Sequence, residues 1–413
     1  MKAGSPRLAG TNSPSHGHPG SVAEVATAFL KLGISSFGGP IAHLGYFHRE
    51  FVQRRRWIDE AHYAQLLALC QFLPGPTSSQ LGFVLGLMRA GWPGAMVAFL
   101  AFTLPSALLL LAFGAVGVYL DNLWGRAAMH GLKLAAVAVV AHALLTMARA
   151  LTPDRARACM AIAAATIILL AGSTWVQLVV VACGAALGPW LCRNVKATSG
   201  SSFAIGYGRR GGLLLLSLFG ALLAVALTPW PSAPPLGQAA CAFYRAGALV
   251  FGGGHVVLPL LKQAVVDPGW LDNNTFLAGY GAAQAVPGPM FSLSAFLGAR
   301  MLGEEYGILG AVTTLLAIFL PGLLLVAGAL PFWRSLGARN GALRMMAGVN
   351  AVVVGLLAAA LYNPVWITAI RDFKDVAIAL TAISLLILAR WSALTVVIFC
   401  VASSMLLAAY LRV

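Results

Sequence analysis

The chain has 413 residues, of which 60% are hydrophobic and only 9% are charged, whereas soluble domains carry roughly 25% charged residues. This composition excludes an ordinary soluble protein, because several runs of about 20 apolar residues could not all be hidden in one soluble core, and it predicts a polytopic membrane protein. The net charge of +15 is typical of basic loops that contact anionic headgroups, so we expect a lipid bilayer as partner and no nucleic acid.

The first apolar segments of the chain are broken in their middle. Residues 1–20 lack the apolar stretch of a cleavable signal and predict a flexible tail. The segment at 22–44 is interrupted by Phe37-Gly38-Gly39-Pro40, residues that a helix interior tolerates poorly. A polar stretch rich in aromatic residues follows and is typical of an interfacial helix. The next segment, at about 63–88, is broken by Pro74-Gly75-Pro76.

The remaining apolar segments fall into two sets. The first set continues at about 93–120, 130–150, 157–172 and 174–192. A Gly/Ser-rich basic linker and one segment at about 212–230 come next. The second set follows at about 237–260, 274–302, 306–331, 343–362, 375–389 and 392–411.

The second set repeats the first. Phe251-Gly252-Gly253-Gly254 follows the first glycine break at a spacing of 214 residues, and Pro287-Gly288-Pro289 follows the first proline break at 213. Leu104-Pro105 matches Leu320-Pro321 at 216, and Gly131 matches Gly348 at 217. This slow drift of the spacing indicates a duplicated membrane unit.

We therefore expect an all-α polytopic membrane protein with four parts. They are a tail at 1–20, a first membrane repeat at 21–192, a basic linker with one unmatched transmembrane helix at 193–236, and a second membrane repeat at 237–413. Counting each broken segment as one crossing gives about 13 transmembrane segments. The unmatched helix makes the second copy enter from the opposite side, so the repeats are expected to be antiparallel. The distribution of Lys and Arg among the loops favours a cytoplasmic N-terminus.

The four breaks predict an anion-binding site. An unpaired backbone group in hydrocarbon costs several kcal/mol, so such breaks must be buried in protein or line a wet cavity. Their freed N–H groups and the helix N-termini behind them attract an anion, although a kink or a close helix contact is the alternative for any single break. The predicted site residues are Lys31, Gly38, Gly39, His43, Gln71, Pro74, Gly75, Pro76, Arg245, Gly252, Gly253, His255, Gln284, Pro287, Gly288 and Pro289.

The side chains in this set differ in their chemistry. Lys31 and Arg245 are single cations inside apolar segments, each six residues before a glycine break. A buried cation costs at least about 2.5 kcal/mol and usually faces a water-filled path, but either side chain could instead snorkel to an interface. The two histidines can hydrogen-bond an oxyanion, carry a proton or simply pack. The two glutamines, which precede the proline breaks, can donate amide N–H groups.

Other classes of site find little support in the sequence. The six cysteines show no CxxC spacing and mostly lie in apolar runs. No cluster of metal ligands and no pair of catalytic carboxylates is visible, and no acidic residue lies deep in a segment. We therefore expect no metal, no cofactor and no enzymatic activity.

The motifs at the four breaks resemble those of the chromate ion transporter family in its long, duplicated form, and the resemblance covers nearly the whole chain. It implies a multi-pass protein of the bacterial inner (plasma) membrane that exports chromate from the cytoplasm and confers chromate resistance, with sulfate as the structural analogue. Gly254 stands where the first copy has Pro40, so the two halves are expected to have unequal roles.

The mechanism that follows is alternating access of a dianion held between inverted repeats, driven by membrane potential or a proton gradient. One alternative is an importer of sulfate or another oxyanion. An alternative of another class is a membrane enzyme acting on a phosphate-bearing lipid, which the lack of catalytic groups opposes. The sequence does not decide between a monomer and a homodimer.

Overall fold

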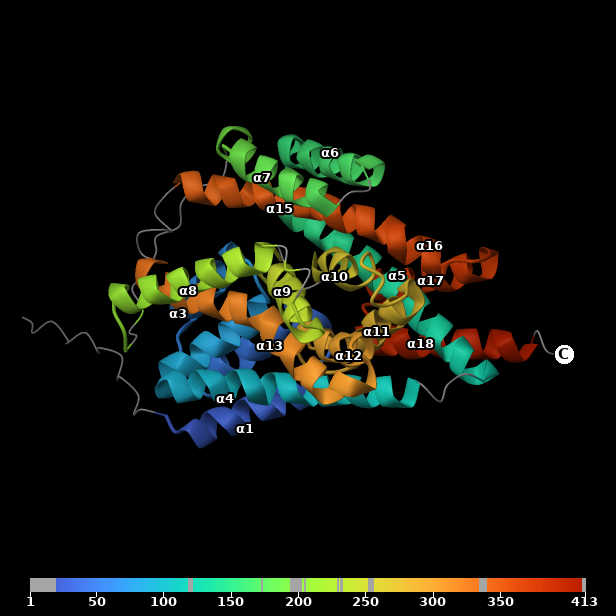
Figure 1. The fold of residues 1–413 in the computed structure, drawn as a ribbon, viewed down its shortest axis with the longest axis horizontal. Helices are drawn as coiled ribbons and strands as arrows, with labels where there is room; N and C mark the ends of the chain where they lie inside the picture. Colours follow the sequence, from blue (N-terminus) through green and yellow to red (C-terminus); the bar gives the residue numbers. More distant parts are fainter. Residues whose placement is uncertain are drawn as a thin grey trace, which may run out of the picture.

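The computed structural model describes residues 20–117, 122–171, 174–193, 203, 206–228, 230, 233–251, 256–333 and 340–410. These residues form helices and no strand, which confirms the all-α prediction. Figure 1 shows the longer helices lying roughly along one axis of the molecule. Six helices in the described part are long and apolar enough to cross a membrane, at Thr77–Ala115, Leu123–Leu151, Arg209–Leu227, Tyr306–Phe332, Asn340–Ala369 and Ala393–Tyr410. The count of 13 crossings stays a prediction.

The longer helices follow the same order in both copies, and the short η elements and α16 differ. The first copy consists of α1 (Val22–Ser35), α2 (Gly39–Phe47), the π-helix η1 (His48–Arg54), α3 (Glu60–Phe72), α4 (Thr77–Gly117), α5 (Leu123–Leu151), α6 (Arg155–Ala171) and α7 (Thr174–Leu191). The unmatched helix is α8 (Arg209–Leu227). The second copy consists of α9 (Pro235–Ala248), α10 (Val257–Val265), α11 (Asn273–Ala285), η3 (Met290–Ser292), α12 (Leu293–Met301), α13 (Gly303–Ala329), η4 (Leu330–Phe332), α15 (Asn340–Ala360), η5 (Leu361–Trp366), α16 (Ile367–Ala369), α17 (Phe373–Ile387) and α18 (Ala393–Tyr410).

Matched residues begin the matched helices α3 and α11. The Asp59 carboxylate accepts a hydrogen bond from the His62 N–H at 2.8 Å, and the Asp272 carboxylate accepts one from the Asn274 N–H at 2.8 Å. An aspartate in this position satisfies a backbone donor of the first turn and stabilises a helix by about 1 kcal/mol. Each proline break therefore follows a short helix whose N-terminus is capped by an aspartate.

The chain reverses direction inside α4. Gly91 has φ 65 and ψ −160, which are not helical angles. An added Cβ at Gly86 would lie 2.5 Å from the Gly94 carbonyl oxygen, although eight residues of a straight helix span about 12 Å. α4 is therefore a hairpin of two arms. α12 and α13 form the corresponding hairpin, because a Cβ at Gly298 would lie 2.5 Å from the Gly310 carbonyl oxygen.

The two copies exchange their last helices. α5 of the first copy packs on α17 and α18 of the second, and α15 of the second packs on α6 and α7 of the first (Figure 1). An added Cβ at Gly131 would lie 2.5 Å from the Val401 Cα, and one at the matched Gly348 would lie 2.7 Å from the Gly188 Cα. These glycines therefore mark matched contacts between the copies.

Ion pairs fasten the first copy near η1. The Trp57 indole N–H donates to Glu24 of α1 at 3.0 Å, and Arg89 at the end of the first arm of α4 pairs with the other Glu24 oxygen at 3.0 Å. Arg55 pairs with Glu50 at 2.6 Å, and its guanidinium lies 5.6 Å from the Trp57 ring centroid. This cluster joins α1, η1 and the α4 hairpin.

We expect acidification to destabilise this region through Glu50. Burial by itself would raise the pKa of Glu50, but hydrogen bonds from Arg55 and Arg54 outweigh it and hold the pKa below the ordinary 4.5. The ionised Glu50 carboxylate therefore stabilises the fold at a pH above 4.5. This contribution to the free energy of unfolding is lost as the pH falls through the lower pKa of the folded state. Thermal unfolding of the purified chain across this range should show the loss. Glu50→Gln should lower the free energy of unfolding at neutral pH by about 1 kcal/mol. It should also weaken the fall of the unfolding temperature at acidic pH, and the same fall in the variant and the parent chain would contradict the assignment.

Candidate functional site

The two kinds of break meet across the copies. The Gly288 N–H donates to the Ser36 carbonyl at 3.0 Å, and the Gly75 N–H donates to the Val250 carbonyl at 2.7 Å. Ser36 and Val250 are matched positions, each directly before a glycine break. The proline break of each copy is therefore hydrogen-bonded to the glycine break of the other. We call the Ser36–Gly288 crossing the first junction and the Val250–Gly75 crossing the second junction.

Backbone geometry explains the glycines at these crossings. Gly38, Gly75 and Gly288 have φ values of 102, 124 and 95, a region that side chains disfavour. The chains also approach closely, because an added Cβ at Gly288 would lie 2.9 Å from the Ser106 Oγ and one at Gly75 would lie 2.9 Å from the Gly322 Cα. Ser106 and Gly322 are themselves matched, each directly after the proline inside a long helix.

Polar side chains surround the first junction. The His43 Nε2 is 3.1 Å from the Ser36 carbonyl oxygen and can donate to it, and its Nδ1 lies 3.5 Å from the Ser78 Oγ. The hydroxyls of Ser106 and Ser292 are 2.6 Å apart. His43, Ser106 and Ser292 are fully buried. Because the Ser36 carbonyl already accepts from Gly288 and His43, it presents little free negative charge to a ligand.

Several buried polar atoms on the same helices have no partner. They belong to the helices that carry His43, Ser78 and Ser106 or directly precede them. Buried polar groups are normally hydrogen-bonded, so this group indicates room for a polar ligand or water. Among the described residues, those without a hydrogen-bond partner on these helices are Ser36 Oγ, Ser79 Oγ and Thr103 Oγ1, together with Gln80 Oε1, whose amide lies at the second junction.

The second junction is apolar by comparison. Val250 replaces Ser36, Val257 replaces His43 and Gly322 replaces Ser106 at the matched positions. The Gln80 amide fills the space there, donating to the Pro74 carbonyl at 2.9 Å and to the Gly322 carbonyl at 3.0 Å. The two crossings therefore share a backbone arrangement but differ in the chemistry they offer to an anion.

The predicted site residues divide between these junctions and other places. Those brought to the crossings are the break residues Gly38, Gly39, Pro74, Gly75, Pro76, Pro287, Gly288 and Pro289, together with His43. Gln284 is buried and donates to the Met290 sulfur at 2.9 Å, whereas Gln71 is exposed. Gly252, Gly253 and His255 lie outside the described residues.

The side chains of the two predicted cations, Lys31 and Arg245, make no hydrogen bond to the described residues of the first junction. Lys31 is exposed on α1, which fits the interfacial alternative. Arg245 is half-buried and lines a separate cavity of about 300 Å³, which Gln238, Trp230 and Trp270 also line. No ion pair involves Lys31 or Arg245 in the described part of the chain.

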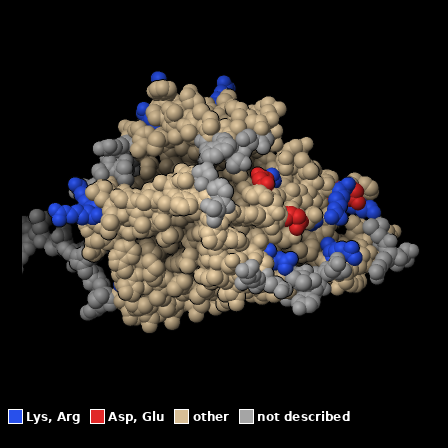
Figure 2. Space-filling view, viewed as in Figure 1, with Lys and Arg blue, Asp and Glu red and all other residues tan. Residues whose placement is uncertain are grey.

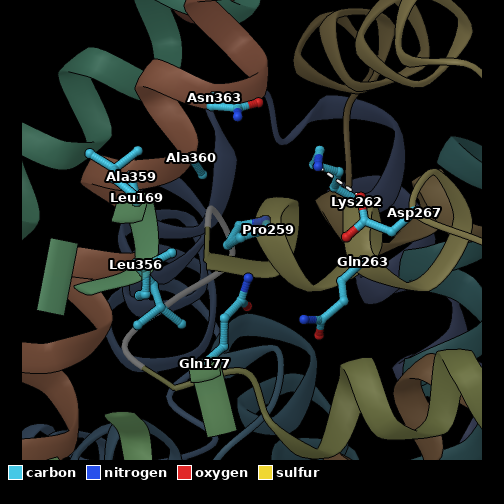
Figure 3. Close-up of a pocket in the computed structure, with 11 residues that line it drawn as sticks. Leu169, Gln177, Pro259, Lys262, Gln263, Asp267, Leu356, Ala359, Ala360 and Asn363 are labelled. Atoms are coloured by element: carbon cyan, nitrogen blue, oxygen red, sulfur yellow. Dashed lines mark hydrogen bonds and ion pairs between the residues drawn. The ribbon is translucent and has the colours of Figure 1, made fainter. Parts of the chain in front are cut away.

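A smaller cavity between the copies was not predicted. It has about 130 Å³ and lies among α7, α10 and η5, lined by Gln177, Gln263 and Asn363. Figure 3 shows Lys262 and Asp267 paired beside it, with their charged atoms 2.7 Å apart. Because this pair is neutral overall, the cavity is less suited to an anion than the first junction.

Sequence reasoning missed several residues that the structure places at the site. Ser36 directly precedes Phe37, Ser106 directly follows Leu104-Pro105, and Thr103 lies just before that pair. A search of the residues flanking each repeated motif would have found them. Lys133, buried in α5, was also overlooked, although it is a single cation in an apolar run. The described residues contain no group of His, Cys, Asp and Glu that could hold a metal ion.

Comparison with known proteins finds relatives over most of the chain. The chain is 34% identical over 361 residues to a probable chromate transport protein of Synechococcus elongatus, covering 84% of this chain and 85% of the relative. It is 30% identical over 369 residues to the chromate transport protein of Cupriavidus metallidurans, covering 86% and 84%. It is 29% identical over 374 residues to that of Pseudomonas aeruginosa, covering 86% and 83%. No solved structure matches the chain.

The match to a family is equally broad. The profile described as Chromate transporter matches residues 23–189 and again residues 237–407. Each matched stretch contains one glycine break and one proline break, so the resemblance predicted from the four motifs is confirmed. The protein is a multi-pass membrane protein, and it belongs to the chromate transporter family.

Proposed function

We propose that this protein exports chromate from the bacterial cytoplasm across the inner membrane and holds the dianion at the first junction. Its relatives are named transport proteins, which indicates a transporter rather than an enzyme. The observation that carries the proposed site is the crossing of the breaks, which places His43 and the unpartnered Ser36 hydroxyl at the contact between the two copies.

The chemistry of the first junction suits a tetrahedral oxyanion. Hydroxyl and N–H donors can surround its oxygens, and α2 begins at Gly39, so that its N-terminal partial positive charge faces the crossing. Neutral donors also release a dianion more readily than a buried ion pair would. Lys31 and Arg245 lie outside the junction, and we assign them to the approach path, where they raise the local anion concentration.

The proposed cycle is alternating access between antiparallel copies with a cytoplasmic N-terminus. Moving one charge across 100 mV is worth about 2.3 kcal/mol, so a dianion leaving a negative interior gains roughly twice that. Export can therefore run on the membrane potential, with a proton gradient as the other source of energy.

Uptake of sulfate is the second candidate. The first junction offers neutral donors, and these do not distinguish sulfate from chromate. Import against a negative interior would need a coupled cation. The direction of flux and competition between the two anions separate the candidates.

Chromate flux in inverted vesicles is the decisive test. We expect chromate to accumulate inside the vesicles and the accumulation to rise with a lumen-positive potential. Lys31→Ala and Arg245→Ala should slow the initial rate severalfold at low ionic strength and less in high salt, because screening weakens electrostatic steering. Sulfate transport without chromate transport would overturn the substrate, and an unchanged rate in both variants would remove these cations from the path.

A further inference from the structure

The matched helices α3 and α11 sit in different environments. In α11, nine residues are buried, whereas in α3 only four are. α11 packs along α5 and α18, but α3 has no comparable contact with α15 or α7. A Cβ at Gly281 of α11 would lie 2.7 Å from the Leu132 carbonyl carbon of α5. The structure is therefore asymmetric even though the copies match in sequence.

The face that α11 buries is the face that α3 exposes. At the spacing of 213 residues, the α11 residues Asn274, Leu277, Gly281 and Gln284 correspond to Ala61, Ala64, Ala68 and Gln71 of α3. Steps of three and four residues place each set on one side of its helix. In α3, Ala61, Ala64 and Gln71 are exposed and Ala68 is half-buried. In α11, Leu277, Gly281 and Gln284 are buried, and Asn274 at the start of the helix is exposed.

The helices that would receive these faces also match. On α5, the Lys133 ammonium donates to the Asn274 side chain at 3.0 Å. The corresponding residue on α15 is Asn350, and its side-chain oxygen is buried without a hydrogen-bond partner among the described residues. Figure 2 shows the surface hollowed between the upper lobe, which contains α6, α7 and α15, and the body below it.

Building on the proposed transport function, we propose that α3 and α11 are the two gates of the transport path, and that Asn350 and Lys133 are the positions on which they close. This structure has α11 closed on α5 and α3 away from α15. In the opposite state α3 docks on α15 with Ala61 beside Asn350, and α11 leaves α5. Because each proline break follows its gate helix, either movement changes access to the junctions.

Reversible cross-linking tests this assignment in the full chain with its six cysteines replaced. One variant carries Lys133→Cys with Asn274→Cys, and the matched variant carries Asn350→Cys with Ala61→Cys. A reducible bis-methanethiosulfonate linker is used, because the contact between Lys133 and Asn274 is made through a long lysine side chain that a direct disulfide would not span. We expect the linker to join each pair, and each cross-link to lower chromate flux about tenfold or more until a thiol reductant cleaves it. The mismatched pair Ala61→Cys with Lys133→Cys should form none.

The two pairs should also exclude each other. In a variant carrying both pairs, one molecule should form one cross-link or the other but not both. If the α3–α15 pair never forms while chromate still moves, or if both pairs form together, the gates are wrongly assigned and the transport function stands. If chromate does not move but the pairs still exclude each other, the gates stand and the substrate is wrong.

Single cysteines give a measurement that needs no pairing. In the state seen here, Ala64→Cys should react with a water-soluble maleimide and the matched Leu277→Cys should be protected. A potential that drives the opposite state should slow the first reaction and speed the second severalfold. Maleimide labelling rates that do not change with the potential at either cysteine would overturn the proposal.

Discussion

Gly288→Ala is expected to abolish most chromate transport and to destabilise the chain. Gly288 has φ 95, a conformation that costs an alanine roughly 1–2 kcal/mol. The new Cβ would also lie 2.9 Å from the Ser106 Oγ and 3.2 Å from the Phe102 carbonyl oxygen. Ser106 must then move from Ser292, and the first junction loses its geometry. Flux in inverted vesicles should fall about tenfold or more, and the unfolding temperature should drop.

A glycine with the same kind of backbone but open surroundings provides the control. Gly303 has φ 68 and nothing within 4 Å of an added Cβ. Gly303→Ala should therefore show only the backbone strain, as a modest loss of stability with transport retained. Equal loss of flux in Gly303→Ala and Gly288→Ala would mean that strain, and not the close approach at the first junction, explains the effect.

The helices and the duplication could be predicted because they depend on local pattern. α18 was expected at 392–411 and lies at Ala393–Tyr410, and α15 was expected at 343–362 and lies at Asn340–Ala360. A long apolar run has few alternatives in a bilayer, so its ends are well determined. The breaks were also visible, because two glycines continue a helix poorly and a Pro-Gly-Pro sequence interrupts it.

The partners of the breaks could not be predicted, because they depend on tertiary packing. Nothing local to Gly288 indicates that its N–H bonds to Ser36, in the other copy. The packing of α5 on α17 and α18, and of α15 on α6 and α7, likewise joins helices of different copies and has no local signal in the sequence. Lys31 and Arg245 looked alike in sequence but differ in the structure, since only the second has α8 beside it to enclose a cavity.

The unequal chemistry of the two junctions was only partly foreseen. Gly254 in place of Pro40 was noticed as a difference between the copies, but Gly254 lies outside the described residues. The differences that the structure brings to the crossings are Val250 for Ser36 and Gly322 for Ser106. They become meaningful only when the crossed hydrogen bonds show that these positions face the breaks.

His43→Ala is the second substitution for which we expect a large effect. His43 is fully buried, and its ring bridges the Ser36 carbonyl at 3.1 Å and the Ser78 Oγ at 3.5 Å. Without it, the Ser36 carbonyl has one donor fewer and faces the proposed anion. We expect chromate flux to fall by about one to two orders of magnitude, the range that loss of one buried donor or a misplaced site produces. Flux measured per folded protein in vesicles checks this.

Three further variants separate a role in binding from a role in packing. His43→Gln keeps an amide donor and should restore part of the flux, whereas a packing role would leave it no better than alanine. His142→Ala changes a half-buried histidine of α5 and should transport normally. Val257→Ala truncates the residue matched to His43 at the apolar second junction, and it should lower stability more than flux. If Val257→Ala stops transport as completely as His43→Ala does, the anion is shared by both junctions and the halves are functionally equal.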